Sequence, residues 1–313
     1  MLFRSLLLAA HAHAISYYDV RLQEEVWGDG AGALVSSSVA PMGRAEKVDG
    51  GYRLSGRYQW SSGCDHARWA MVGFFVNDQN TGARQHALAV LPRADYEIVD
   101  TWFAAALRGT GSKDLVVTEV FVPEYRVETM HALNFRTARG FGQHSGPLYR
   151  LPFQPIFAAG FSAVALGIAT SALEHYKTRL AGRLRAYTGA RVTESAPAYM
   201  KLAESYHEVH AASLILEREV HSIIDASRCD EPPSLDTMVA WRTHQAFATK
   251  LCVSAVDRVF GASGGGAVLL SSALQRCFRD VHAAAAHAYC DYDVASQILG
   301  RHLLGLPMDG QLL

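Results

Sequence analysis

The chain has few cysteines and no surplus of charge of either sign. Its five cysteines are an odd number scattered along 313 residues, and none belongs to a C-x-x-C pair. This spacing argues against a disulfide framework and a structural zinc site, so a reducing, cytoplasmic compartment is the default expectation. With 29 Lys and Arg against 30 Asp and Glu, the net charge is −1, and no basic field is available for a nucleic-acid backbone.

Long apolar runs are also missing. No stretch approaches the roughly 18 consecutive apolar residues of a transmembrane helix, so no membrane association is expected. The N-terminal stretch MLFRSLLLAAHAHA imitates a secretory signal, with one arginine, a short apolar run and an A-x-A-like ending. The helical spacing of Leu6, Leu7, Ala10 and Ala14 favours the other interpretation, a helix over residues 1 to about 28 that ends at the glycines of WGDGAGAL.

Several motifs of common enzyme classes are incomplete or wrongly placed. A dinucleotide fingerprint needs a strand before it and a helix after it, whereas GDGAGA follows a predicted helix and GASGGG joins two predicted helices. No G-x-S-x-G elbow of a serine hydrolase is present. Glu204 and His207 form one Glu-x-x-His pair, but a di-iron centre needs a second pair, so a metal site is not expected.

What is present is a globular composition, 50% hydrophobic and 19% charged, with a sheet-forming region near the N-terminus. From Leu34 to about Val122, short runs rich in Val, Tyr, Trp and Phe alternate with turn signals. Asp49-Gly50 and Asn80-Thr81-Gly82 are typical hairpin turns. The region therefore predicts an antiparallel sheet or barrel.

Beyond a loop rich in Gly, Pro and aromatic residues, the pattern is helical to the end of the chain. Helices are expected over about 156–186, 235–260 and 271–289. Another predicted helix carries one buried stripe, made of Leu202, Tyr206, Val209, Leu216, Val220 and Ile223. The fold class is therefore α+β, with partial N-terminal helices over 1–30, a β domain over 31–130 and a C-terminal four-helix bundle over 131–313.

One stretch interrupts the sheet pattern. YQWSSGCDHARWAMVGFF places two serines and a glycine between a tryptophan and a Cys-Asp-His cluster, and then resumes as apolar strand. Taken alone, this favours a β-bulge in which Ser61 and Ser62 satisfy backbone groups.

Three further motifs accompany this stretch: VSSSVAPMGRAEKVDGGYRLSGRY, RGTGSKDLVVTEVFVP and FGASGGGAVLLSSALQRCFRDVHAAAAH. In this order, on a helix, sheet and bundle plan, they resemble the acyl-CoA dehydrogenase fold, and more narrowly its branch of two-component flavin-dependent oxygenases, such as those acting on 4-hydroxyphenylacetate and seco-steroid phenols. The resemblance runs from about Leu6 to Leu313 and is strongest in W-x-S-G-C-D-H and R-D-x-x-x-A-x-x-H. That family begins with a longer helical domain, so the resemblance implies a shortened or misassigned N-terminus.

The chemistry separates the oxygenase branch from the dehydrogenases. A dehydrogenase removes an acidic α-proton and needs a carboxylate base, which many members carry after the glycine-rich turn. No Asp or Glu lies between Asp257 and Asp280, which favours an oxygenase. An acyl-CoA dehydrogenase, an N- or S-oxygenase of the same fold and a truncated paralogue without catalysis stay open as alternatives.

The resemblance implies a flavin site. Ser62 matches the serine that contacts flavin N5, Trp60 would wall the ring and Ser61 lies beside them. His287 matches the histidine near flavin C4a, where imidazole can donate or tune a proton, and His282 faces elsewhere. An oxygenase of this branch works through a C4a-hydroperoxyflavin, which requires a dry pocket.

The resemblance also implies a substrate site. His11 matches a histidine that binds the substrate hydroxyl and favours the phenolate, with His13 as the competing assignment. Ser37 matches a serine on the substrate side, with Ser36 and Ser38 as neighbours of uncertain register.

The flavin phosphate needs positively charged donors. Arg179 or Arg183 occupies the helix position where the family places such an arginine, although a solvated basic helix face is the other interpretation. The turn with Ser263, Gly264 and Gly265 offers backbone N–H groups to the flavin of a neighbouring subunit.

The resemblance finally implies partners. These are reduced FMN, or FAD in its reduced form, delivered by a separate flavin reductase, together with O2 and a phenolic or polycyclic aromatic substrate. It also implies a homotetramer assembled through the C-terminal bundle.

Overall fold

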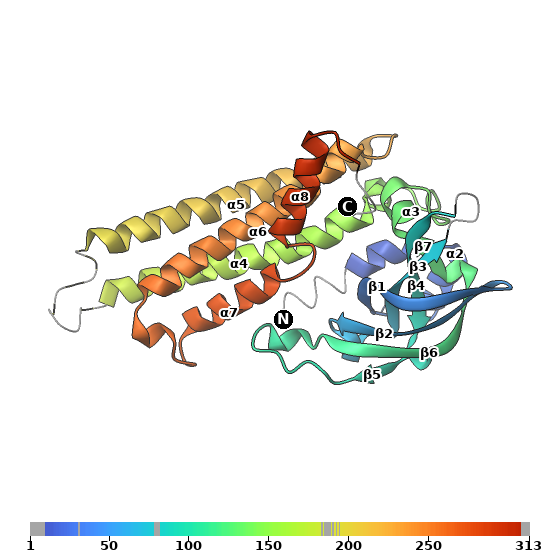
Figure 1. The fold of residues 1–313 in the computed structure, drawn as a ribbon, viewed down its shortest axis with the longest axis horizontal. Helices are drawn as coiled ribbons and strands as arrows, with labels where there is room; N and C mark the ends of the chain where they lie inside the picture. Colours follow the sequence, from blue (N-terminus) through green and yellow to red (C-terminus); the bar gives the residue numbers. More distant parts are fainter. Residues whose placement is uncertain are drawn as a thin grey trace. The chain divides into compact units, whose positions relative to one another are not determined.

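The computed structural model describes residues 10–30, 32–77, 82–182, 184, 189, 191, 193 and 195–307. The chain divides into two compact units (Figure 1). The first comprises Met1–Ala104, Arg108–Phe157 and Ile223–Pro233 and contains the sheet. The second comprises Ala105–Leu107, Ala158–Ser222 and Ser234–Leu313 and contains most of the long helices. The three-part division expected from the sequence stays a prediction.

The N-terminal region, predicted as one helix, is interrupted. Residues 10–15 are helical, residues 16–18 form a turn, and α2 (Val20–Trp27) then begins. Asp19 is the N-cap of α2, and its carboxylate accepts a hydrogen bond from the Arg21 N–H at 3.0 Å. An aspartate satisfies the free amides at a helix start, so the helix restarts here. Leu6 and Leu7 lie outside the described residues.

The sheet has the strand order β5-β6-β2-β1-β3-β4-β7 within the described residues. Its strands are β1 (Val35–Val48), β2 (Gly51–Ser61), β3 (Trp69–Asn77), β4 (Arg84–Pro92), β5 (Glu97–Val99), β6 (Lys113–Pro123) and β7 (Val127–Thr129). The predicted hairpin at Asp49-Gly50 is confirmed, because Val48 pairs with Gly51 and Gly50 has a left-handed φ of 72°. Asn80 and Thr81 lie outside the described residues, although the strands that flank them, β3 and β4, are antiparallel neighbours.

The sheet is mixed, so the prediction of a wholly antiparallel sheet was wrong for one pair. β1 runs parallel to β3, with Val35 opposite Trp69 and Ser38 opposite Val72. The turn signals that predicted the hairpins identify strands that follow each other in the sequence. β2 lies between β1 and β3 in the sequence, so β1 and β3 become neighbours in the sheet only through tertiary packing.

A glycine allows β1 and β3 to approach closely. The register between them shifts between Ser38 and Pro41, opposite Gly73. A Cβ atom added to Gly73 would lie 2.0 Å from the Val39 carbonyl oxygen. Only glycine fits this position without displacing the backbone of β1.

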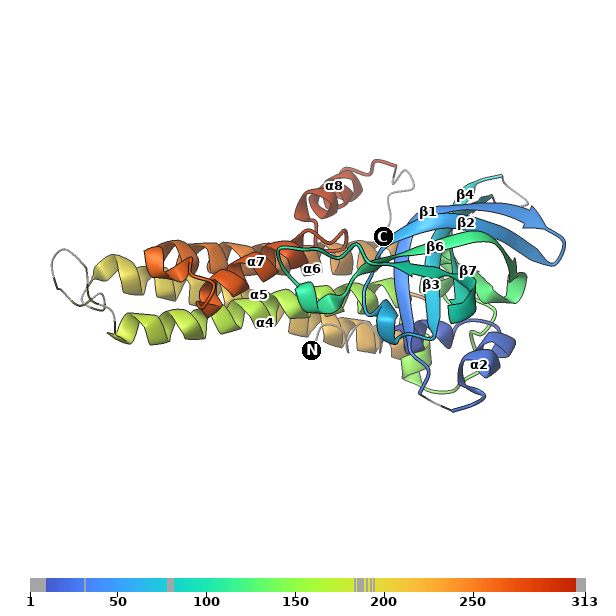
Figure 2. The ribbon, with the colours of Figure 1, turned by 90° about the horizontal axis from the view of Figure 1, so that it is seen from below.

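The second unit is helical. Its long helices lie along one another in both ribbon views (Figures 1 and 2), and α7 and α8 each pack on α6. The helices are α4 (Phe153–Gly182), α5 (Ala196–Arg228), α6 (Leu235–Ala262), α7 (Ala273–Ala285) and α8 (Tyr292–Leu303). Tyr176, Leu216, Val256 and Val281 are among the residues of their shared core. The α+β fold class with a helical bundle is thereby confirmed, while α8 and the short α3 (Met130–Phe135) were not predicted.

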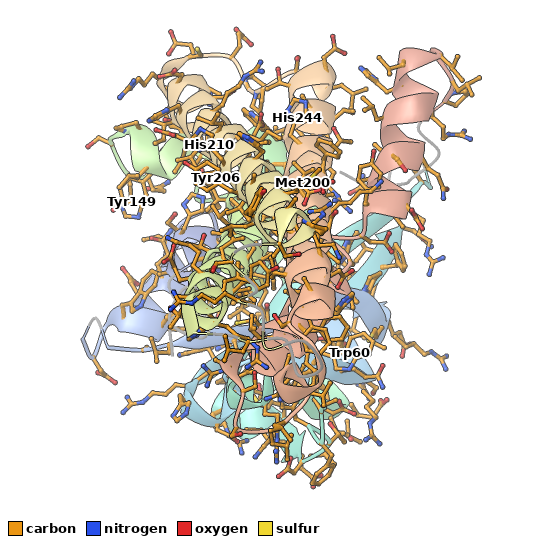
Figure 3. The ribbon with its side chains drawn as sticks, turned by 90° about the vertical axis from the view of Figure 1, so that its left-hand side faces the viewer. Trp60, Tyr149, Met200, Tyr206, His210 and His244 are labelled. Atoms are coloured by element: carbon orange, nitrogen blue, oxygen red, sulfur yellow. The ribbon has the colours of Figure 1, made fainter. Side chains whose placement is uncertain are left out.

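The stripe predicted on α5 was partly wrong. Tyr206, labelled in Figure 3, is 57% exposed, and Val220 is 41% exposed. The buried line is Ser205, Val209, Ala212, Leu216, Glu219 and Ile223. These residues alternate in steps of four and three, but small and polar side chains occupy half of the line. The prediction, which relied on large apolar residues, therefore selected some positions next to this buried line.

Helix α4 is long and apolar enough to cross a membrane by length and composition, although polar residues interrupt its apolar stretches. Half of its most apolar window is buried within the protein. Buried core helices pass the same test, so the expectation of no membrane association stays a prediction.

Candidate active site

The end of β2 turns the Trp60 side chain outward. Trp60 has a φ of 65°, a left-handed conformation that is rare for a bulky residue. The register between β2 and β6 shifts between Tyr58 and Ser61, which indicates an irregularity of the bulge type. The indole is 62% exposed (Figure 3), whereas the neighbouring Ser61 is fully buried. The strand therefore presents a flat aromatic surface at its end.

Three hydroxyl groups are joined by short contacts, and the first belongs to Ser62, two residues after this tryptophan. Ser62 Oγ lies 2.7 Å from Ser112 Oγ, which lies 2.7 Å from Thr110 Oγ1. The Gly63 N–H donates to the Thr110 carbonyl at 3.0 Å, so the backbone also joins the two segments. We call Ser62, Ser112 and Thr110 the hydroxyl trio. Ser112 and Thr110 were not predicted, although hydroxyl residues flanking a glycine in RGTGS were a visible signal.

Ser61 has a different environment from Ser62. Its hydroxyl donates to Ser36 Oγ at 3.1 Å and is fully buried. The Ser61 side chain therefore joins β2 to β1, and only Ser62 of the predicted serine pair carries a hydroxyl that belongs to the trio.

The two predicted substrate residues lie together. His11 Nε2 is 2.7 Å from Ser37 Oγ, and both side chains are buried. The edge of the His11 ring contacts Phe157, with 5.5 Å between ring centroids. Ser38 instead donates to the Gln59 carbonyl at 2.7 Å. Because side chains alternate along a strand, Ser37 points to one face of β1 while Ser36 and Ser38 point to the other.

His13, the competing assignment, binds elsewhere. Its Nε2 lies 3.0 Å from the Leu151 carbonyl oxygen, so this nitrogen must donate. Burial lowers the pKa of His13 to about 4. The neutral His13 imidazole therefore has a structural contact with the backbone. Of these two histidines, only His11 contacts Ser37.

His287 lies just beyond the end of α7, in a loop and not within the predicted helix. Its ring stacks on Phe161, with a centroid distance of 3.6 Å and an interplanar angle of 20°. The Tyr289 N–H donates to His287 Nδ1 at 3.2 Å, which leaves the imidazole proton on Nε2. Burial, and then the charge of Arg242, lower the pKa of His287 to about 4. His282 instead lies 2.8 Å from an Asp257 carboxylate oxygen.

The predicted phosphate arginine contacts the predicted glycine-rich turn. Arg179 Nε donates to the Ser263 carbonyl at 3.0 Å. The Ser263 hydroxyl is buried and donates to the Val259 carbonyl, so only its backbone is presented. Gly264 has a φ of 67°, and a Cβ on Gly266 would lie 2.6 Å from Arg179 Nη2. Gly265 begins a short 3-10 turn over Gly265–Ala267. Arg183 lies outside the described residues.

The donors at these positions fit a flavin. The hydroxyl trio and the indole are neutral, which suits the polar edge and the face of an isoalloxazine. Arg179 beside a turn without side-chain bulk suits a phosphate. Among the residues placed by the structure, no group of three His, Cys, Asp or Glu could hold a metal ion.

Residues 159–292 match the family model described as acyl-CoA dehydrogenase, C-terminal domain. The chain is 46% identical over 306 residues to the oxygenase component of p-hydroxyphenylacetate 3-hydroxylase from Acinetobacter baumannii, which covers 97% of this chain and 72% of that protein. It is 36% identical over 304 residues to the flavin-dependent monooxygenase oxygenase subunit HsaA of Mycobacterium tuberculosis (strain ATCC 25618 / H37Rv), covering 97% and 77%.

Solved structures agree with these relatives. The 3-HSA hydroxylase from Rhodococcus sp. RHA1 matches with a TM-score of 0.91 and 33% identity, covering 99% of this chain and 80% of that one. XiaF from Streptomyces sp., solved with FADH2 and glycerol, matches with a TM-score of 0.88 and 26% identity, covering 97% and 77%. The resemblance predicted from the motifs is confirmed, and the chain belongs to the flavin-dependent monooxygenase oxygenase components built on the acyl-CoA dehydrogenase fold.

Proposed function

We propose that this chain is the oxygenase component of a two-component monooxygenase that hydroxylates a phenolic substrate. The balanced reaction converts reduced flavin, O2 and the phenol into oxidised flavin, the hydroxylated phenol and water. Bound reduced flavin would supply the two electrons that activate O2. The names of the relatives, which include a p-hydroxyphenylacetate 3-hydroxylase and an FADH(2)-dependent resorcinol hydroxylase, support this class of substrate.

The observation that carries the proposal is the buried contact between His11 and Ser37. Imidazole is the side chain best suited to accept a phenol proton near neutral pH, and the serine hydroxyl can donate to the resulting oxygen. Removing that proton raises the electron density of the ring carbon that is to be oxidised. A buried polar pair beside the aromatic Phe157 suits a small phenol.

Three side chains of the sheet unit are proposed for flavin binding. Ser62 would present its hydroxyl to the polar edge of the ring, and Ser112 would orient that hydroxyl through their 2.7 Å contact. Trp60 would cover the ring with its exposed indole. These three side chains carry no charge, so they can exclude water without fixing an ion beside the flavin.

In the helical unit, His287, Arg179 and the glycine-rich turn are proposed to act on a flavin. His287, neutral at physiological pH and protonated on Nε2, would donate a hydrogen bond and move a proton. Arg179 and the backbone of Gly264 and Gly265 would bind the flavin phosphate. The family resemblance supports a homotetramer in which the turn serves a neighbouring subunit. A flavin reductase would supply the reduced cofactor, FMN or FAD, and the five free cysteines support a cytoplasmic location.

The test mixes the purified chain with chemically reduced FMN or FADH2 in air-saturated buffer, together with a panel of simple phenols. The proposal expects hydroxylated product in proportion to flavin oxidised, and loss of that product in His11→Ala. Oxidation of bound reduced flavin with no product from any phenol would contradict the proposed reaction. Reduction of oxidised flavin by an acyl-CoA would instead favour the dehydrogenase alternative, and failure to bind reduced flavin would favour a non-catalytic paralogue.

A further inference from the structure

A buried arginine lies behind His287. Arg242 on α6 is only 6% exposed. Its Nη1 donates to the Tyr289 carbonyl at 2.8 Å and its Nη2 donates to the Ala288 carbonyl at 2.7 Å. These carbonyls belong to the two residues that follow His287. The Arg242 guanidinium therefore attaches the loop between α7 and α8 to α6. We call this loop the histidine loop (residues 286–291).

The same loop holds the imidazole through its own backbone. The Tyr289 N–H donates to His287 Nδ1, while the carbonyl of Tyr289 accepts from Arg242. The N–H groups of Cys290 and Asp291 donate to the His287 carbonyl at 2.7 and 3.1 Å. The Ala288 carbonyl, which accepts from Arg242 Nη2, belongs to the same planar peptide unit as the Tyr289 N–H, so moving that carbonyl would move the N–H as well.

The charge of Arg242 is not neutralised by an ion pair within the described residues. Its hydrogen bonds go to backbone carbonyls, and its guanidinium lies 5.7 Å from the Tyr289 ring centroid. The titratable or charged groups facing this region are Tyr289, Cys290 and Asp291 on the loop and Arg242 itself on α6. On α4 the ring stacked against His287 is Phe161, which carries no charge. Arg242 is thus the positive charge that opposes protonation of the imidazole.

We infer that Arg242 is a positioning residue that holds the His287 imidazole in one orientation and one tautomer, with its proton on Nε2. Its two carbonyl contacts set the position of the Tyr289 N–H, and that N–H occupies Nδ1 as an acceptor. The lowered pKa of His287 has the cause expected from this arrangement, burial followed by the arginine charge. The functional consequence, a ready donor on Nε2, rests on the role proposed above for His287.

The test follows the His287 ring directly, by ¹H–¹⁵N correlation spectroscopy of the flavin-free full chain between pH 4 and 8. We expect the native protein to show a single neutral tautomer across most of this range. Arg242→Met removes the charge and both donors, and should raise the pKa of His287 from about 4 towards the ordinary value of 6.5. The ¹⁵N shifts should also indicate a mixture of tautomers. Arg276→Met, at an exposed arginine on α7, is the matched control and should leave both readouts unchanged.

Arg242→Lys covers the case in which the methionine variant fails to fold. Lysine keeps a positive charge but lacks the planar fork that reaches two adjacent carbonyls, so it should loosen the tautomer preference. A folded Arg242→Met with native pKa and native ¹⁵N shifts would overturn the inference, and so would native shifts in Arg242→Lys. The readout needs no flavin. If the ring responds but product per flavin oxidised is unchanged in Arg242→Met, the inference stands and the proposed role of His287 is wrong.

Discussion

His11 Nε2 lies 2.7 Å from Ser37 Oγ, although 26 positions separate them in the chain. The histidine belongs to the N-terminal helical segment and the serine to β1, so the sheet unit brings two distant stretches to one buried point. A buried imidazole and a buried hydroxyl each need a polar partner, and these two side chains partner each other. Within the candidate site, removal of this pair should therefore affect substrate binding most directly.

Substituting His11 by Ala should weaken the binding of a phenol that the enzyme hydroxylates. Losing a hydrogen bond to a partly charged group costs about 1.5–3 kcal/mol, which corresponds to a rise of roughly tenfold or more in Kd. Titration calorimetry with the phenol measures this change. His13→Gln is the control, because His13 binds the Leu151 carbonyl and should leave the Kd unchanged. Equal losses in both variants would contradict a specific role for His11.

The hydroxyl trio yields a test of flavin binding. Ser112→Ala removes the partner that orients Ser62, and Ser62→Ala removes the proposed flavin contact itself. Both should lower the affinity for reduced flavin, by about threefold to tenfold for a single neutral hydrogen bond. Anaerobic fluorescence titration measures this affinity. Ser296→Ala, at a half-buried serine of α8 in the helical unit, should bind flavin normally, and a Ser112 variant that does the same would show that the trio only packs the turn.

Stability should fall as the pH drops from about 6.5 towards 4. His13 and His287 each have a pKa lowered to about 4 in the folded protein, while the ordinary value is 6.5. In this window the unfolded chain binds a proton that the folded chain does not, so acid favours unfolding. At pH 5 each histidine should cost about 2 kcal/mol relative to pH 8.

Urea unfolding at pH 8 and pH 5 measures this cost. His13→Gln keeps a donor for the Leu151 carbonyl but cannot titrate, so it should remove roughly half of the difference between the two pH values that these histidines cause. A His13→Gln variant with the full native difference would show that His13 is not neutral in the folded state.

Gly73→Ala should destabilise the sheet unit by about 2 kcal/mol or more, because the new methyl group would meet the Val39 carbonyl at 2.0 Å. Thermal unfolding measures the loss. Gly167→Ala on the exposed side of α4 has open space around its Cβ position and should raise stability by up to about 1 kcal/mol. Two variants of equal stability would show that β1 can move away from β3 without penalty.

The motifs that predicted the fold depend on local chemistry. The Asp49-Gly50 turn and the helical spacing of apolar residues act within a few residues, so the hairpin and most long helices could be predicted from the sequence. The parallel pairing of β1 with β3 could not, because no local signal distinguishes it. The same limit explains α5, where Ser205, Ala212 and Glu219 are buried by the helices around them and not by their own hydrophobicity.

The candidate site shows the same division. His11, Ser37, Ser62 and His287 were named from motif resemblance, which carries positions but not contacts. Ser112 and Arg242 were missed because each acts on a named residue through space, across 50 positions for Ser112 and through two backbone carbonyls for Arg242. A sequence without coordinates does not indicate which hydroxyl groups contact each other, or which arginine donates hydrogen bonds to the backbone of a distant loop.

The three adjacent serines of β1 face opposite sides of one strand, with Ser37 towards His11 and Ser36 and Ser38 towards β2. Deleting a single residue just before this tract would exchange the two sides, since a strand has a two-residue repeat. Ser37 would then face β2, and Ser38 would take its place towards His11. The three-serine tract therefore keeps a hydroxyl towards His11 after such a shift, and the loss falls instead at the place of Ser38, where Val39 has no donor for the Gln59 carbonyl.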